Sequence, residues 1–184
     1  MLNAFNAAFY LVKTLTDLYL LTFLFRFILQ WVRADFYNPL SQFIVRATNP
    51  LVVPARRIVP SVGELDVATL VVLAALECAV TWLLLAIVGT GFAFDTFMVY
   101  VLLRLISLTI WLYSIAILVY VVLSFLAQAA YSPIAMLLGQ VVGPVLRPVR
   151  RIIPPIAGLD LSPWLVFILL QALMIALPLP AYLR

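Results

Sequence analysis

The chain contains the same proline and arginine motif twice, and this repeat limits the folds that it can adopt. The pattern Pro-x3-Pro-x-Arg-Arg-x2-Pro covers residues 50–60 and occurs again, 94 residues later, at residues 144–154. The same offset aligns further identical residues without a gap: Leu18 with Leu112, Tyr19 with Tyr113, Tyr37 with Tyr131, Pro39 with Pro133, and Asp66 with Asp160. A long gapless repeat indicates two copies of one supersecondary unit. We therefore expect one repeat over residues 1–94 and a second over residues 95–184.

The composition predicts that both repeats lie in a membrane. Hydrophobic residues make up 67 % of the chain and charged residues 10 %, whereas charged residues are about 25 % of a typical soluble domain. Histidine is absent and Cys78 is the one cysteine, which argues against disulfides, Cys/His zinc sites and histidine-based catalysis. We therefore expect a membrane protein that is not an enzyme and holds no metal or other cofactor.

Four apolar stretches predict four transmembrane helices, two in each repeat. The stretches cover residues 4–33, 67–88, 95–127 and 161–177. An amphipathic segment follows the first helix of each repeat, at residues 38–49 and 133–140, and we expect it to lie in the membrane interface. The expected fold class is an all-α membrane protein with four transmembrane helices, built as two tandem parallel repeats. Each repeat adds an interfacial amphipathic helix and a Pro/Arg-rich loop.

The repeated motif itself predicts short turns at the membrane surface. Proline lacks a backbone N–H and disrupts a helix interior, so we expect no continuous helix through Pro50, Pro54 and Pro60. Asp66 and Asp160 follow the two copies and precede apolar stretches. Aspartate is a favoured N-cap, so we expect both residues to cap the helices that come next.

The distribution of arginine predicts the orientation of the chain. Each repeat has two expected spans, so both repeats must have the same orientation in the membrane. The segments after the first and third expected spans carry most of the basic residues: Arg33, Arg46, Arg56, Arg57, Arg147, Arg150 and Arg151. The positive-inside rule places these segments in the cytoplasm and both termini outside. Topology also explains the net charge of +4, so we expect no nucleic-acid partner.

Two charged residues are expected deep in the membrane. Arg26 and Glu77 lie inside the first and second apolar stretches, and the second repeat has Tyr120 and Gln171 in their places. A charge at this depth is costly unless it is paired, so we expect Arg26 and Glu77 to form an intramembrane pair. Two interpretations stay open: a structural pair that fixes helix packing, and part of an ion or proton relay.

Residues 31–43, with the sequence WVRADFYNPLSQF, and the two motif copies with Asp66 and Asp160 resemble the YggT family of bacterial membrane proteins. The family is also called YlmG in other bacteria and in plastids. The resemblance covers the whole chain and implies a multi-pass protein of the bacterial cytoplasmic (inner) membrane. It links the chain to osmotic or potassium homeostasis, to cell division and envelope organisation, or, through plastid relatives, to haem-protein maturation.

The candidate site residues support two functional hypotheses. Five arginines of the motif copies are expected to bind anionic lipid headgroups or an acidic protein: Arg56, Arg57, Arg147, Arg150 and Arg151. Under the first hypothesis the chain is a non-enzymatic scaffold or accessory factor for cell-division or envelope proteins or for membrane-protein assembly. Under the second it supports ion movement in osmotic stress, with Arg26 and Glu77 as the gate. Four spans enclose only a narrow path, so transport would call for a homo-oligomer.

Overall fold

The computed structural model describes residues 2–60, 66–126, 132–153 and 160–183, and these residues form helices and connections without a β-strand. The expected all-α class is therefore confirmed for the described chain. Its helices are α1 (Leu2–Trp31), α2 (Pro39–Ala55), α3 (Val67–Val88), α4 (Phe94–Phe125), α5 (Pro133–Ile152) and α6 (Ser162–Ala176). The helices α2 and α5 begin at equivalent positions of the sequence repeat, 94 residues apart.

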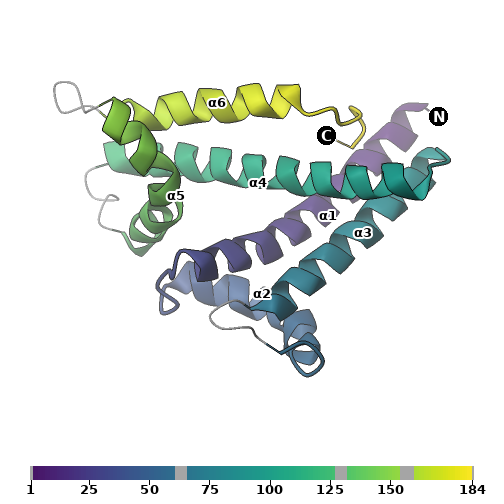
Figure 1. Cartoon of the computed structure of the whole chain (residues 1–184), viewed down its shortest axis with the longest axis horizontal. Helices are drawn as coiled ribbons and strands as arrows, with labels where there is room; N and C mark the ends of the chain where they lie inside the picture. Colours follow the sequence, from purple (N-terminus) through teal and green to yellow (C-terminus); the bar gives the residue numbers. More distant parts are fainter. Residues whose placement is uncertain (1, 61–65, 127–131, 154–159, 184) are drawn as a thin grey trace.

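The two sets of three helices have the same internal arrangement. The first and third helices of each set pack together, α1 on α3 and α4 on α6, and the middle helix of each set contacts both. Helix α4 also contacts α1 and α3, which joins the two sets. Both termini and the connection from α3 to α4 lie at the right of Figure 1, whereas α5 lies at the far left and α2 at the bottom. The helices in which the two motif copies begin, α2 and α5, therefore both lie away from the termini.

Three helices are long and apolar enough to cross a bilayer. They cover Asn3–Trp31, Val67–Val88 and Phe94–Phe125, which agrees with the expectation of a membrane protein. Helix α6 is also apolar but has 15 residues. At 1.5 Å per residue it is about 22 Å long, shorter than the hydrocarbon core of about 30 Å. A fourth span through α6 therefore stays a prediction.

The core is shared between the two sets of helices. Leu20, Phe23 and Leu29 of α1 belong to one buried cluster with Leu137 and Val141 of α5. The cluster also holds buried residues of α2, α3 and α4: Ile44, Val52, Leu73 and Leu108. This cluster therefore joins the two repeats, while a separate buried cluster, with Ala116, Leu138 and Val166, lies within the second repeat.

The prediction that the motif prolines interrupt the helix is wrong for Pro50 and Pro54, although α2 does end at Ala55, before Pro60. Helix α2 continues through Pro50 and Pro54, and α5 continues through Pro144 and Pro148. In each helix the two prolines are four residues apart and lie on the exposed side. The carbonyls that they leave without a helical partner are four residues earlier. They therefore also lie on an exposed side, where water or headgroups can bind them.

The starts of α2 and α5 follow from the sequence. Asn38 accepts a hydrogen bond from the backbone N–H of Leu40 at 3.0 Å, and Ser132 accepts one from Ala135 at 3.2 Å. Pro39 and Pro133 occupy the first helical position, where a missing N–H costs nothing. The amphipathic pattern of α2 is also present, since its buried residues recur every three or four positions: Ser41, Ile44, Thr48 and Val52.

Candidate functional site

The expected pair of Arg26 and Glu77 does not form. Nη1 of Arg26 donates hydrogen bonds to Oγ1 of Thr48 at 2.6 Å, to Oδ1 of Asn49 at 2.9 Å and to the carbonyl of Val45 at 3.3 Å. All three acceptors belong to α2, which packs between the ends of α1 and α3. The Arg26 side chain therefore binds the interfacial helix, and Glu77 finds its partner elsewhere.

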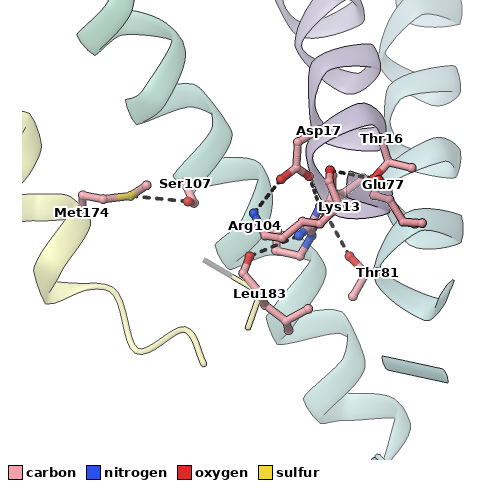
Figure 2. A network of polar contacts seen from close by, with 10 residues as sticks. Lys13, Thr16, Asp17, Glu77, Thr81, Arg104, Ser107, Met174 and Leu183 are labelled. Carbon is pink, nitrogen blue, oxygen red and sulfur yellow. Dashed lines mark hydrogen bonds and ion pairs between the residues drawn. The ribbon is translucent and has the colours of Figure 1, made fainter. Parts of the chain in front are cut away.

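Glu77 pairs with Arg104, which comes from the second set of helices. Nε of Arg104 lies 2.7 Å from Oε1 of Glu77, and Nη2 lies 2.6 Å from Oδ1 of Asp17. Nζ of Lys13 lies 2.8 Å from Oδ2 of the same aspartate, and Thr81 donates to Oε1 of Glu77 at 3.0 Å. We call these five residues the polar network; it connects α1, α3 and α4 (Figure 2).

The polar network is balanced in charge and has a buried centre, while Lys13 and Asp17 are partly exposed. The side chain of Arg104 is 2 % exposed and that of Glu77 is fully buried. The remaining Nη1 of Arg104 donates to the carbonyl of Leu183 at 3.1 Å, so each terminal nitrogen of this guanidinium has a partner. Within the described chain, Oε2 of Glu77 is a buried atom without a hydrogen-bond partner. Two carboxylates and two cations compensate one another, which the interior requires.

The second repeat has no counterpart of the polar network. The positions equivalent to Lys13, Asp17 and Glu77 hold Ser107, Trp111 and Gln171. Gln171 donates instead to the hydroxyl of Ser114 at 3.0 Å. The charged centre is therefore a property of one side of the molecule, in agreement with the asymmetry expected from the sequence.

Arg104 was not predicted to be a member of the site. Its equivalent in the first repeat is Tyr10, so the repeat gave no reason to select it. The sequence did contain one indication, because Arg104 lies within a long apolar stretch, where an arginine needs a partner. Which acid it meets depends on how α4 packs on α1 and α3, and sequence spacing does not define that packing.

A pocket of about 250 Å³ lies beside the polar network. Lys13, Asp17, Arg104 and Ser107 contribute its polar lining, and Trp111 is among its apolar lining residues. It gives a small polar space next to the buried charges, which is relevant to the transport hypothesis.

The motif arginines divide into two groups according to their contacts. Arg56 donates from Nε to Oδ1 of Asp66 at 3.3 Å and also bonds Oδ2 through Nη2. Arg150 donates from Nε to Oδ2 of Asp160 at 2.8 Å. We call Arg56 and Arg150 the paired arginines, because each joins the end of one helix to the start of the next. The other members, Arg57, Arg147 and Arg151, are the exposed arginines.

Asp66 and Asp160 stand at helix starts, with different side-chain contacts. Asp66 occupies the N-cap position of α3, but its carboxylate binds Arg56 and the Thr69 hydroxyl, the latter at 2.7 Å, and no backbone N–H. Asp160 precedes α6 and accepts a hydrogen bond from the backbone N–H of Ser162 at 2.9 Å. Asp66 is therefore at the expected N-cap position but makes no capping hydrogen bond, because Arg56 and Thr69 bind its carboxylate. Asp160 lies one residue before the N-cap of α6, which is Leu161, and its carboxylate binds the first N–H of the helix.

These contacts lower the pKa of both aspartates. Burial alone would raise the pKa of Asp66, but the hydrogen bonds from Arg56 and Thr69 outweigh it and keep the pKa below the ordinary 3.8. Burial would likewise raise the pKa of Asp160, but the hydrogen bonds from Ser162 and Arg150 outweigh burial and lower the pKa. A lowered pKa means that the ionised aspartate stabilises the fold above the ordinary pKa, and that this stabilisation is lost as the pH falls through the lowered one.

We expect the double variant Asp66→Asn and Asp160→Asn to unfold more easily than wild type at neutral pH. The difference in free energy of unfolding should be largest above the ordinary aspartate pKa of 3.8 and should vanish at lower pH, because wild type then also has neutral side chains. Unfolding in mixed micelles between neutral and acidic pH measures this difference. A difference that does not depend on pH would contradict the contribution of the ion pairs.

Comparison with known proteins identifies the family. The CCB3/YggT family model matches residues 5–88 and 99–180. An uncharacterized protein of Pseudomonas aeruginosa is 42 % identical over 93 % of this chain and 88 % of its own length. An uncharacterized protein of Vibrio alginolyticus is 43 % identical over 90 % of each chain. The uncharacterized protein YggT of Escherichia coli is 36 % identical over 91 % of this chain and 87 % of its own length. No solved structure matches the chain. The chain therefore belongs to the CCB3/YggT family.

Proposed function

We propose that this protein is a non-enzymatic scaffold or accessory protein of the bacterial cytoplasmic membrane. In this proposal the exposed arginines face the cytoplasm and bind an acidic segment of another membrane or cell-division protein, close to anionic lipid headgroups. Both termini then lie on the outer side. The relatives are named as uncharacterized proteins, so the proposal depends on the residues of this chain.

The observation that supports the proposal most strongly is that the two neighbouring arginines of each motif copy have different contacts. The first arginine of each pair binds an aspartate ten residues later in the chain, Asp66 or Asp160. The second, Arg57 or Arg151, is exposed. The positive-inside rule alone requires basic residues in these segments, but it does not require a fixed geometry around them. The same Arg–Asp contact beside an exposed arginine is present in both motif copies, and this favours a surface that presents arginine to a partner protein.

The residues beside the exposed arginines also favour a partner. Ile58 is 84 % exposed and Ile152 is 79 % exposed, and each directly follows the second arginine of its pair. A large apolar side chain next to arginine gives both contact area and charge, a combination that is common in protein interfaces. Arginine also binds carboxylates in a bidentate manner, which gives a geometric preference that lysine does not.

Site-specific photo-crosslinking in native membranes tests this proposal. A photoreactive residue at position 58 or 152 is expected to crosslink to the same acidic protein, because the two positions are equivalent. Phe94 is 77 % exposed and lies at the start of α4, at the end of the molecule that carries the termini, so it serves as the matched control position. Crosslinks to lipid alone from positions 58 and 152 would overturn the scaffold proposal.

Ion transport is the second candidate function, and one observation favours it. The polar network places Asp17 and Arg104 at the wall of a pocket of about 250 Å³. In the same network Oε2 of Glu77 is buried and has no hydrogen-bond partner in the described chain. Buried ionisable residues beside a polar space are typical of proton and ion pathways. A transport role in osmotic stress would require Glu77 to change its protonation or its partner during the cycle.

A further inference from the structure

A groove with apolar walls lies between the two repeats. Its volume is about 290 Å³. Helices α1 and α2 of the first repeat and α4 and α5 of the second line it, with side chains that include Leu21, Phe25, Ile44, Ile115, Val119 and Leu138. We call it the inter-repeat groove. Helices α1 and α4 contact each other and diverge toward the ends that lead to α2 and α5 (Figure 1). Both are long and apolar enough to cross a bilayer, so the groove lies between two helices that can span the membrane.

The two sides of the inter-repeat groove are equivalent in the sequence repeat. The offset of 94 residues relates Leu21 to Ile115 and Phe25 to Val119, and it also relates Ile44 to Leu138. Equivalent positions of two copies meet only where the copies face each other. A molecule in the groove therefore contacts both repeats through the same set of positions.

Two small residues leave space in the walls of the groove. Thr22 of α1 and Ala116 of α4 line it and are also equivalent in the repeat. The Thr22 hydroxyl already donates a hydrogen bond to the carbonyl of Tyr19 at 2.7 Å. Ala116 is 5 % exposed, whereas Val119 is 38 % exposed. The inter-repeat groove therefore has a buried floor and an accessible rim.

The chemistry of the walls selects an apolar occupant. Among the described residues, the lining has no charged side chain. Water needs two to four polar partners to stay in a cavity, and apolar cavities remain dry. A polar solute would lose its hydrogen bonds to water without replacement. Because proteins leave few voids larger than a water molecule, we expect an apolar molecule of the bilayer to fill the groove.

The shape of the groove favours a lipid acyl chain over a helix of another protein. A helix with its side chains is about 10 to 12 Å wide, and it packs on side chains that are exposed before it binds. The floor of the groove is instead buried between α1 and α4, which already contact each other. An unbranched acyl chain is thinner than a helix and reaches such a floor.

Polar contacts between the repeats lie at one end of the groove. Nδ2 of Asn38 donates a hydrogen bond to the carbonyl of Pro133 at 2.6 Å. Leu40 and Ile134, in the first turns of α2 and α5, are close to this contact in the sequence and line the groove. Amphipathic helices such as α2 lie at the level of the lipid headgroups. The groove therefore leads from the headgroup level to the space between α1 and α4, which is also the path of a lipid acyl chain.

We propose that the inter-repeat groove binds one acyl chain of a membrane phospholipid, whose headgroup lies beside the starts of α2 and α5. The chain forms an apolar joint between the repeats, in addition to the polar contact of Asn38 and the polar network. A ligand that binds only the folded state stabilises it, so the bound lipid also stabilises the arrangement of the two repeats. This site depends neither on the scaffold proposal nor on ion transport.

Photo-crosslinking from a lipid chain tests the groove. The full chain is reconstituted in vesicles of phosphatidylglycerol and phosphatidylcholine, the latter with a diazirine halfway along one acyl chain, and the crosslinked residues are mapped by mass spectrometry. Leu21 and Phe25 are buried, whereas Leu169 and Leu173 of α6 are 55 % and 50 % exposed. We expect a higher yield at Leu21 and Phe25, because a chain in the groove contacts them. A lower yield at these two buried residues than on α6 would show only the ordinary surrounding lipid and would overturn the proposal.

Two variants should close the groove. Ala116→Phe fills the floor and should reduce crosslinking at Leu21 and Phe25 at least tenfold. Val119→Trp narrows the rim and should have the same effect; because Val119 is partly exposed, this variant keeps the test valid if Ala116→Phe does not fold. Val99→Trp is the matched control, since Val99 is 52 % exposed on the same helix and does not line the groove. Equal crosslinking in Val119→Trp and Val99→Trp would show that the acyl chain is not in the groove.

Native mass spectrometry of the same proteins in non-ionic detergent tests a second copy of the chain as the occupant. We expect Val119→Trp to lose a bound phospholipid that wild type retains, without a change in oligomeric state. A dimer of wild type that Val119→Trp dissociates, with equal lipid binding, would assign the groove to a second copy and overturn the proposal. Crosslinking to a partner protein from positions 58 and 152 is a separate measurement, so the two proposals fail independently.

Discussion

Replacing Arg104 with methionine is expected to destabilise the folded protein by about 3 to 5 kcal/mol, because a buried charge pair then loses one member. Arg104 binds both Asp17 and Glu77 and is 2 % exposed. Without it, the carboxylate of Glu77 retains only the hydroxyl of Thr81 as a hydrogen-bond donor among the described residues. Lys13 still compensates Asp17, so most of the loss should arise at Glu77. Reversible unfolding in mixed micelles measures the effect.

Two further variants make this prediction specific. Arg46→Met removes an exposed arginine of α2 and should change stability by no more than about 0.5 kcal/mol. The double variant Glu77→Gln and Arg104→Met should recover part of the loss, because it removes both charges of the pair. If Arg104→Met alone were as stable as wild type, the polar network would not be the structural centre that the geometry indicates.

Changing the exposed arginines Arg57, Arg147 and Arg151 to glutamate is expected to reduce crosslinking from positions 58 and 152 to the acidic partner at least tenfold. Like charges facing each other repel, and the reversal also removes the bidentate donors. The fold should be retained, because these side chains are exposed and are not the arginines that bind Asp66 and Asp160. Crosslinking yield in native membranes, normalised to the amount of protein, is the readout.

Orientation must be measured in the same samples, since basic residues also direct insertion. The triple lysine variant is the matched control: it keeps the charge and orientation but loses the bidentate geometry, so we expect an intermediate yield. A reversed-charge variant that is inserted correctly and crosslinks as strongly as wild type would contradict the role of the exposed arginines.

The apolar stretches and the two amphipathic segments predicted where the helices lie, although α2 and α5 extend beyond the expected residues 38–49 and 133–140. Residues 67–88 were predicted as a helix from the apolar stretch that follows Asp66, and the structure has the same bounds. Gly89, with φ 73°, is the C-cap of this helix. The effect of the prolines could not be predicted, because it depends on whether the carbonyls that they leave unpaired can reach solvent or headgroups. In α2 and α5 the prolines lie on the exposed side, so the helices continue.

The partners of buried charges could not be predicted in the same way. Arg26 and Glu77 were assigned to each other because they were expected at similar depth on neighbouring helices. The hydrogen bond from Arg26 to Thr48 depends on how α2 packs on α1. The ion pair of Arg104 with Glu77 depends on contacts between the two repeats. Repeat symmetry carries no information about contacts between its two copies.

The choice between scaffold and transporter is tested most directly by ion flux. Potassium and sodium flux should be measured in liposomes that contain the purified protein at verified incorporation and orientation, with wild type and Glu77→Gln compared side by side. The scaffold proposal predicts that neither protein raises the flux above that of protein-free liposomes. A flux in wild type that Glu77→Gln removes would contradict it and would assign the polar network to ion movement.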